Sequence, residues 1–381
     1  MIQSSLINHG FERYLLDILK SIKPNNILVV TGEKSFDDSN IASRLMPLLS
    51  EYKVQRYSGF SSNITVEDLN KGIEITRQFM PDIIIAIGGG SVIDMAKQIN
   101  IFSKHDNIPN IIINNQKKLG DKLCPLVAIP TTTGTGSEET HFAVIYIDKK
   151  KYSVANKEMI PEHKIIDSSL SHSMPIKLQA SCGFDALSQS VESYWSIKSS
   201  EESRRYSMES IKLIIDNFKR SIDGDLDSKN NMAKAANLSG KAINISKTTA
   251  AHAISYPLTI HYDIPHGHAV ALTLGYFFEI NSKFTNEQIN DNRGDNYLNN
   301  IMKDLFRLFN VNNARECKQY WYKLMKDVGL EINANKLGIT DEKDIQRILH
   351  DVDPVRISNH PIMISKEIIH NILSSMITKN D

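Results

Sequence analysis

Short runs of consecutive apolar residues alternate with stretches of helical periodicity in the first half of the chain. Residues 26–31, 82–87 and 126–129 are apolar almost throughout, which is typical of strands that are buried on both faces. Residues 41–49 and 92–101 have the spacing of helices. Apolar strands separated by helices predict a doubly wound, Rossmann-like parallel sheet, an architecture that binds nucleotides.

Other patterns extend this picture along the chain. Thr65, with Asp68 three residues later, predicts the cap of a helix that runs toward Phe79. Residues 142–147 and 152–155 predict a hairpin appended to the sheet. From about Pro175 the β-branched runs fade and helical patterns continue to the end. We therefore predict an α/β domain over residues 1–176 and an all-α domain over residues 177–381.

A glycine-rich loop, residues 88–91 (GGGS), joins the second apolar strand to the next helix. Glycines let backbone N–H groups approach a phosphate, and a helix N-terminus adds partial positive charge. We therefore name Gly89, Gly90 and Ser91 as candidate cofactor contacts. A plain strand-to-helix turn that needs glycine dihedrals is the alternative. Asp94 fits either a cofactor contact or a favourable charge at the helix start.

A second polar loop, residues 130–138 (PTTTGTGSE), follows the third apolar strand. Its hydroxyl groups and two glycines can wrap a ribose or a pyrophosphate, and the candidates are Thr131, Thr132, Thr135 and Ser137. The alternative is a simple polar connection into the hairpin. Two loops of this type after parallel strands favour a dinucleotide site.

The helical half holds a candidate metal site. Asp185 and Gln189 are four residues apart and so share one face of a helix. His252 lies in a helical stretch, and His266 follows fourteen residues later in a Pro-His-Gly turn. A carboxylate, an amide and two imidazoles can converge on one divalent cation and leave a position for substrate. Each histidine alone fits a structural role as well; only the combination favours a metal.

Composition narrows the class of protein. The chain has 381 residues with 44 basic and 44 acidic side chains, so no long-range field favours a polyanion, and we expect no nucleic-acid partner. Its three cysteines, Cys124, Cys182 and Cys317, form no CxxC motif and fit a reducing compartment. No apolar run approaches the length of a membrane span, and no signal peptide is indicated, so we expect a cytoplasmic protein without a membrane partner.

The segments GGGSVIDMAK and PTTTGTGSE, the Asp185 segment and the Pro-His-Gly turn resemble the iron-containing (group III) alcohol dehydrogenases in order and spacing. The resemblance runs over essentially the whole chain. It implies the dehydroquinate synthase-like fold, with a Rossmann-like N-terminal domain and a helical C-terminal domain. It further implies NADPH or NADH, one Fe²⁺ or Zn²⁺ ion, a small aldehyde or alcohol as substrate, and a homodimer or larger homo-oligomer.

The resemblance also assigns ligands. Those enzymes bind the metal through an aspartate and three histidines. Asp185, His252 and His266 fall on the aspartate and on two histidines, whereas Gln189 falls on the remaining histidine and Tyr256 replaces a histidine near the nicotinamide. An amide oxygen is a neutral, harder and weaker ligand than imidazole. The resemblance therefore leaves the metal's identity and affinity open.

Glutamine and tyrosine at these two places, together with residues 197–207, 241–259 and 264–274, resemble the branch of phosphonoacetaldehyde reductases. This implies reduction of phosphonoacetaldehyde to 2-hydroxyethylphosphonate, a reaction of phosphonate biosynthesis.

A dianionic phosphonate needs fixed positive charge, and Lys247 is the first candidate to supply it. Arg204 and Arg205 are alternatives that also fit a solvated basic face. Tyr256 is a candidate for orienting the substrate or relaying a proton, and packing against the cofactor is an equal alternative. His268 is a second candidate for the proton relay.

Cofactor preference follows from the end of the first strand. NAD-preferring relatives often place an aspartate where Gly32 stands, and a carboxylate there repels a 2′-phosphate. Gly32 removes that repulsion, and Lys34 and Ser35 can contact the phosphate. Glu33 acts in the opposite direction, so the sequence favours NADPH only modestly.

Three other functions fit parts of the sequence. A general reductase of lactaldehyde or of 1,3-propanediol-type substrates would use the same site. A lyase like dehydroquinate synthase would use a similar fold, with NAD and a metal, but would consume no NAD(P)H. A non-catalytic protein with a decayed metal site would account for Gln189.

Overall fold

The computed structural model describes residues 3–7, 10–114, 119–148, 150–352 and 354–377. The chain forms two compact units, Met1–Ser173 and Met174–Asp381. Our predicted division after residue 176 falls in the first turn of the helix α7, Ile176–Trp195.

The first unit is built on a six-stranded sheet whose neighbouring strands all pair in parallel, in the order β1-β8-β5-β4-β2-β3. This confirms the predicted doubly wound architecture. The strands are β1 (Gln3–Ile7), β2 (Asn26–Thr31), β3 (Lys53–Tyr57), β4 (Ile83–Gly88), β5 (Leu126–Pro130) and β8 (His163–Asp167).

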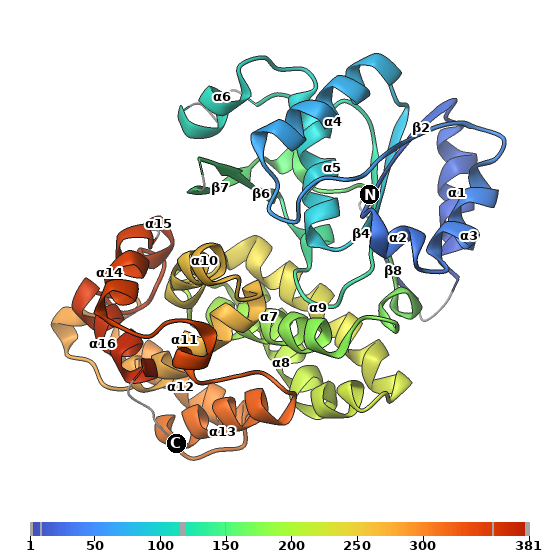
Figure 1. Cartoon of the computed structure of the whole chain (residues 1–381). Coiled ribbons are helices and arrows are strands. Elements are labelled where there is room, and N and C mark those ends of the chain that lie inside the picture. The colour runs from blue at the N-terminus through green and yellow to red at the C-terminus, as the bar shows by residue number, and fades with distance from the viewer. Residues whose placement is uncertain (1–2, 8–9, 115–118, 149, 353, 378–381) are drawn as a thin grey trace. The chain divides into compact units, whose positions relative to one another are not determined.

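Successive residues of the central strands point to opposite faces, and helices cover both faces (Figure 1). In β2, Ile27 and Val29 pack in one core cluster, and Leu28 and Val30 pack in the other. Because both faces are buried, the central strands β2, β4 and β5 are apolar along most of their length. One face carries α1 (Phe11–Ile22), α2 (Lys34–Asp37) and α3 (Ile41–Leu45); the other carries α4 (Val66–Phe79), α5 (Gly90–Phe102) and α6 (Ile108–Asn114).

Two local predictions in this unit are confirmed. Thr65 caps α4, since its Oγ1 accepts a hydrogen bond from the backbone N–H of Asp68 at 3.2 Å. The hairpin is the antiparallel pair β6 (Phe142–Ile147) and β7 (Lys150–Ala155).

The helix predicted over residues 41–49 is shorter than expected. It ends as α3 at Leu45, and Met46–Leu49 forms a 3₁₀ turn. Pro47 accounts for the change, because proline has no N–H to continue the α-helical ladder.

In the second unit, every named element among the described residues is a helix, as predicted. Its core contains Trp195 and Trp321, which contact Phe278 through edge-to-face rings. The helices are α7, α8 (Glu201–Ile222), α9 (Leu226–Ser246), α10 (Ala250–Tyr262), α11 (His266–Ile280), α12 (Gly294–Leu308), α13 (Ala314–Asp327), α14 (Glu342–Asp351), α15 (Pro354–Ile357) and α16 (Lys366–Ile377).

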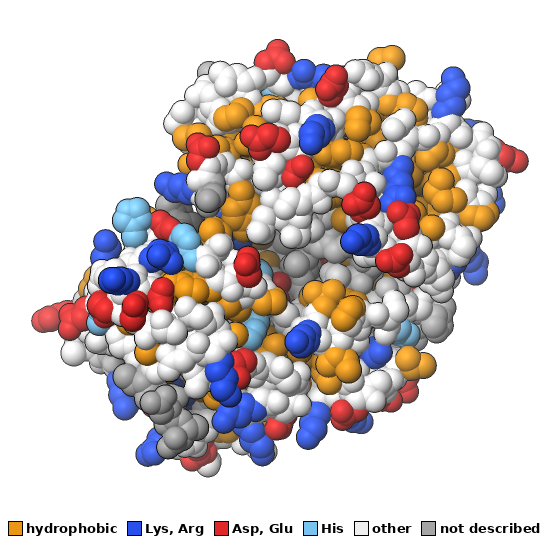
Figure 2. Space-filling model, viewed as in Figure 1, with side chains coloured by type: hydrophobic (Ala, Val, Ile, Leu, Met, Phe, Trp, Pro, Cys, Tyr) orange, Lys and Arg blue, Asp and Glu red, His pale blue; other side chains and the backbone are white. Residues whose placement is uncertain are grey.

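The surface carries no dominant charge on the face shown in Figure 2, where acidic and basic side chains are interspersed. Within the described ranges, none of the helices is both long and apolar enough to cross a membrane. The three cysteines are free thiols. Burial raises the pKa of Cys124 and of Cys182 to about 12, so neither behaves as a reactive thiolate.

Candidate functional site

The predicted cofactor loops lie along one edge of the sheet. They follow β2, β4 and β5, which are neighbours, and Gly88 at the end of β4 pairs with Pro130 at the end of β5. The backbone N–H of Thr131 also donates to the carbonyl of Gly88 at 2.9 Å. Because the chain runs outward in both directions from β2, to β3 on one side and β4 on the other, these carboxyl ends mark a topological switch point. Ligands of doubly wound sheets bind there.

The glycines of the first loop make room for the second. A Cβ atom built on Gly90 would lie 2.7 Å from both Oγ1 and Cγ2 of Thr135, and one on Gly89 would lie 3.3 Å from Cγ2 of Thr132. Gly89 is also the N-cap of α5 and brings no side chain to cap it. Since Gly89, Gly90 and Thr135 are only half-buried, the start of α5 can receive a phosphate.

Asp94 and Ser137 contact each other. The hydroxyl of Ser137 donates to one oxygen of Asp94, and the backbone N–H of Val144 donates to the other at 2.9 Å. Burial raises the pKa of Asp94. These contacts connect α5 to the second loop and to β6, so both side chains hold the loop in place.

Lys97 is a residue of this region that the sequence reasoning did not single out. It is 1% exposed, and its Nζ donates to the carbonyl of Ser137 at 2.5 Å and to Oγ1 of Thr140 at 2.9 Å. Burial lowers its pKa to about 8, although nearby carboxylates oppose the shift. The available signal was a lysine on a helix whose neighbouring turns are mostly apolar, three residues after Asp94.

A second unanticipated cation, Arg56 on β3, lies beside the end of β2. Arg56 donates from Nε to Oγ1 of Thr31 at 2.8 Å and from Nη2 to the carbonyl of Gly32 at 3.0 Å, and it pairs with Asp37. Lys34 and Ser35 begin α2 beside it and are exposed.

Three of the four predicted metal ligands meet in the helical unit. Oδ1 of Asp185 on α7 lies 3.5 Å from Nε2 of His252 on α10 and 3.9 Å from Nε2 of His266 on α11. One ligand atom from each residue lies within 4.8 Å of the others. Donors bound at about 2 Å to one cation are roughly 3–4 Å apart, so this spacing fits a single divalent metal.

A buried nitrogen supports that fit. Nε2 of His252 is inaccessible to solvent and has no hydrogen-bond partner in the described part of the chain. Its Nδ1 pairs with the carboxylate of Glu192, which is fully buried and also accepts from Oγ1 of Thr249 at 2.7 Å and from the N–H of Ala251 at 2.9 Å. Glu192 therefore fixes the ring with Nε2 toward Asp185, as second partners of metal-bound histidines commonly do.

Glu192 was not predicted, although its spacing offered a signal. Asp185, Gln189 and Glu192 lie at i, i+4 and i+7 of α7 and share one helix face. Burial alone would raise the pKa of Glu192 and lower that of His252. Their mutual charge and hydrogen bond lower the pKa of Glu192, and the same pair together with Asp185 raises that of His252.

His266 is the first residue of α11, with Pro265 as the N-cap, so our placement of it on a turn was wrong. The adjacent Gly267 explains how it reaches Asp185. A Cβ atom on Gly267 would lie 2.0 Å from the carbonyl oxygen of Ser181 and 2.8 Å from Cβ of Asp185. Only glycine lets the start of α11 pack this closely against α7.

The remaining candidates have other neighbours. Oε1 of Gln189 accepts from the hydroxyl of Ser239 at 2.9 Å. The ring of Tyr256 stacks on His266 at 5.8 Å and 13°. Nε2 of His268 donates to the carbonyl of Glu331 at 2.6 Å, and His268 lies outside the three-residue ligand group.

The three candidate cations for a phosphonate lie on α8 and directly after α9. Lys247 is the C-cap of α9. Arg204 on α8 donates to the hydroxyl of Tyr297 at 2.7 Å and covers that ring, and Arg205 is exposed beside Tyr206. The side chains of both arginines therefore contact neighbouring tyrosines, Arg204 with Tyr297 and Arg205 with Tyr206.

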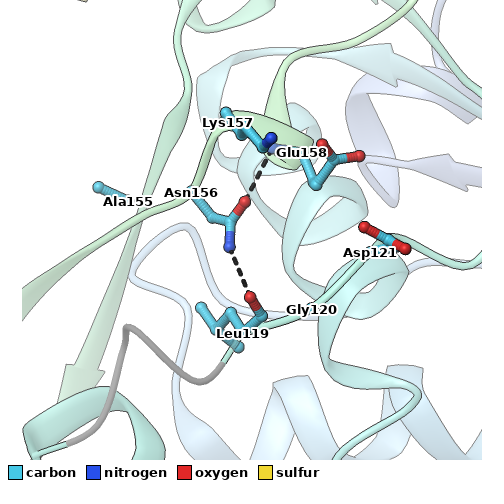
Figure 3. A pocket seen from close by; sticks show the side chains of 7 residues that line it. All are labelled: Leu119, Gly120, Asp121, Ala155, Asn156, Lys157 and Glu158. Atoms are coloured by element: carbon cyan, nitrogen blue, oxygen red, sulfur yellow. Dashed lines mark hydrogen bonds between the residues drawn. The ribbon is translucent and has the colours of Figure 1, made fainter.

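A pocket in the α/β unit involves none of these candidates. As Figure 3 shows, Asn156 spans it, donating to the carbonyl of Leu119 at 3.1 Å and accepting from the N–H of Glu158 at 2.8 Å. It lies beside the β7 end of the hairpin and shares no residue with the loops at the carboxyl edge of the sheet, so it is not the cofactor site.

Comparison with known proteins gives a consistent result. The model of the family described as iron-containing alcohol dehydrogenase matches residues 4–168, and that of the C-terminal domain of Fe-containing alcohol dehydrogenases matches residues 179–377. An NADPH-dependent butanol dehydrogenase of Clostridium saccharobutylicum is 33% identical over 282 residues, 72% of either chain. Lactaldehyde reductase of Escherichia coli is 27% identical over 290 residues, 75% of this chain and 74% of the other.

Among solved structures, sulfoacetaldehyde reductase from Bifidobacterium kashiwanohense, in complex with NAD⁺, matches with a TM-score of 0.85. The two chains are 25% identical, and the match covers 100% of each.

Proposed function

The chain belongs to the iron-containing alcohol dehydrogenase family, and on this premise we propose that it reduces phosphonoacetaldehyde to 2-hydroxyethylphosphonate. The convergence of Asp185, His252 and His266, whose ligand atoms lie within 4.8 Å of one another, is the observation that carries the metal-dependent reduction. The substrate is supported by the sequence features of the phosphonoacetaldehyde reductase branch. The similarity to a sulfoacetaldehyde reductase adds support, because that enzyme's substrate is also a small aldehyde with a tetrahedral anionic group.

In this proposal, some residues of the helical unit bind the metal and others orient those ligands. A divalent cation, when bound, supplies a Lewis acid for the aldehyde oxygen. Asp185, His252 and His266 hold it, and Glu192 accepts the Nδ1 proton of His252, so that Nε2 presents its lone pair. Gln189 lies one turn from Asp185 and is a fourth ligand in this proposal. Ser239, which donates to its amide oxygen, orients that side chain.

Tyr256 orients the substrate. Its ring is fixed against His266, and it is only 5% exposed, so it forms an apolar wall that excludes water next to a ligand. His268 is less suited to relay a proton, because burial lowers its pKa and its Nε2 already donates to a backbone carbonyl.

The dinucleotide, when bound, supplies the hydride. Gly89, Gly90, Ser91 and residues 131–135 bind its phosphates, while Asp94 and Ser137 hold the second loop. We propose NADPH as the preferred form. Support comes from Gly32, which places no carboxylate near the 2′-position, from Lys34 and Ser35, and from the guanidinium of Arg56 at the end of β2.

An aldehyde panel tests the proposal. Purified protein loaded with Fe²⁺ or Zn²⁺ is given phosphonoacetaldehyde, lactaldehyde or butanal with each reduced cofactor, and nicotinamide absorbance is followed. We expect kcat/KM to be highest for phosphonoacetaldehyde with NADPH.

Equal rates on the uncharged aldehydes would instead indicate a general small-aldehyde reductase. The named activities of the butanol dehydrogenase and the lactaldehyde reductase favour that second candidate.

A further inference from the structure

Lys247 has a backbone conformation that normally requires glycine. Its φ of 63° and ψ of 179° lie in a region that L-residues with side chains adopt only at a cost. The neighbouring structure enforces it. The N–H of Lys247 donates to the carbonyl of Ile243 at 2.9 Å, and the side-chain amide of Asn359 donates at 2.9 Å to the carbonyls of both flanking residues, Ser246 and Thr248.

A strained position that carries lysine in place of glycine indicates that the side chain has a use. Glycine would remove the strain and leave every one of these backbone hydrogen bonds intact. The strain therefore marks the ammonium group, and not the turn itself, as the feature that is needed at this point.

A second cation lies against the same turn. Nη1 of Arg356 on α15 donates to Oγ1 of Thr248 at 3.0 Å, one residue after Lys247. The guanidinium carbon lies 5.2 Å from the ring centre of Tyr256, whose ring stacks on His266. The ring of Tyr256 thus contacts both Arg356 and the predicted metal ligand His266.

Other parts of the chain connect this turn to the ligand group. Thr249, which follows Thr248, donates to Glu192, the carboxylate that fixes His252. The carbonyl of Ser246 also accepts a hydrogen bond from the hydroxyl of Ser196 at 2.9 Å. Ser196, Asn359 and Arg356 therefore all donate hydrogen bonds to this turn. The turn that carries Lys247 and contacts Arg356 is therefore connected by hydrogen bonds to the carboxylate that fixes His252.

We propose that Lys247 and Arg356 form an anion subsite that binds the tetrahedral head group of the substrate while its aldehyde faces Asp185, His252 and His266. The inference rests on the proposed function and adds its specificity-determining residues. A guanidinium presents a fork of donors to two oxygens of the head group, and the ammonium adds a point charge. Two cations match the two charges of a phosphonate.

The first experiment concerns Arg356. For Arg356→Ala we expect the ratio of kcat/KM for phosphonoacetaldehyde to that for butanal to fall roughly 10- to 100-fold, mainly through KM, as expected for loss of charged hydrogen bonds. Arg356→Lys should restore part of the ratio. Arg315→Ala removes an exposed arginine of α13 and serves as the matched control, with the ratio unchanged.

The second experiment separates charge from strain at Lys247. Lys247→Ala and Lys247→Gly both remove the ammonium group, so both should lower the same ratio by a similar factor. Only the glycine variant relieves the backbone, so it should melt roughly 2–4 °C above the alanine variant. Equal melting temperatures would contradict the strain argument, and an unchanged ratio in both variants would remove Lys247 from the subsite.

A binding measurement avoids dependence on turnover. Calorimetric titration of the metal-loaded protein with 2-hydroxyethylphosphonate should give a dissociation constant that rises roughly tenfold or more in Arg356→Ala. The corresponding sulfonate, which carries one charge, should bind more weakly to the wild-type protein and lose less in the variant.

The outcomes distinguish the two proposals. If the wild-type protein does not prefer phosphonoacetaldehyde, the proposed substrate is wrong. If it prefers phosphonoacetaldehyde and neither Arg356→Ala nor Lys247→Ala changes the preference, the subsite is wrong and the proposed function stands. If sulfoacetaldehyde is the better substrate and both variants lose it, the subsite is supported and the phosphonate is overturned.

Discussion

The cofactor edge of the α/β unit is made of backbone and small side chains, whereas the ligand group of the helical unit is made of polar side chains from three helices. Gly89, Gly90 and Thr135 act by leaving space next to a helix N-terminus. Asp185 and His252 act by the position of single atoms. The difference teaches that the two sites should respond to opposite changes. An added side chain should weaken cofactor binding at the first, and a removed side chain should weaken metal binding at the second.

The largest expected effect tests this independence. Asp185→Ala removes the only carboxylate among the three ligands, so kcat/KM should fall on the order of 1000-fold and the metal content should drop. Cofactor affinity, followed by NADPH fluorescence, should change little, because the loops belong to the other unit. Metal analysis that found full occupancy in a variant with normal turnover would contradict the assigned role.

A smaller effect is expected one contact away from the metal. Glu192→Gln keeps the size of the side chain but loses the charge that holds His252, so metal affinity should fall about 10- to 100-fold. Chelator competition measures it, and excess metal should restore activity. Glu279→Gln, at a partly exposed ion pair of α11, is the control. Unchanged affinity in Glu192→Gln would show that the carboxylate only fills space.

The cofactor edge should respond to an added methyl group. Gly90→Ala places a Cβ atom 2.7 Å from Thr135, and displacing that loop at a cost of about 1.4 kcal/mol weakens NADPH binding about tenfold. Metal affinity should stay at the wild-type value. Gly120→Ala is the matched control, since nothing lies within 4 Å of its Cβ position. Equal NADPH affinity in the two variants would show that the short distance between Gly90 and Thr135 does not matter for cofactor binding.

The smallest effect compares two buried imidazoles of the helical unit. His252 has a carboxylate partner, whereas burial lowers the pKa of His360 to about 3 from its usual 6.5. Between pH 6.5 and 3 the unfolded chain binds a proton at His360 that the folded chain excludes. Stability is therefore complete above pH 6.5 and falls below it, by up to about 1.4 kcal/mol per pH unit.

Urea unfolding at pH 7 and pH 5.5 measures this dependence. His360→Gln should flatten it by removing the titrating group while keeping an amide able to contact Asn281. The same slope in wild type and variant would assign the acid sensitivity to other groups.

The sequence predicted the fold well where burial is uniform along a segment. β2, β4 and β5 are covered on both faces, so each is an unbroken apolar run. β3 escaped prediction because it lies at the sheet edge, where its first four residues are exposed or half-buried. β8 escaped prediction because His163, Lys164 and Asp167 leave it only two apolar residues, too short a run to indicate a strand.

For the candidate site, short-range motifs were sufficient to name the loops and three ligands, but not the residues that support them. Glu192 lies seven residues after Asp185 on the same helix face, so helical periodicity could have predicted it. Arg356 lies about one hundred positions beyond Tyr256, and the packing of α15 against α10 brings the two together. No local pattern encodes such a contact.

Gly267 has a consequence for anyone who would rebuild this centre elsewhere. The side chains of the three predicted ligands are easy to copy onto another helical scaffold, yet their spacing depends on how closely two helix backbones approach at a residue without a side chain. If a residue with a side chain stood at the position of Gly267, the two helices would lie farther apart. The same ligands would then be too far from one another to bind one cation. The geometry of the centre therefore depends on an interhelical distance, which is set by Gly267, a residue that offers no ligand atom itself.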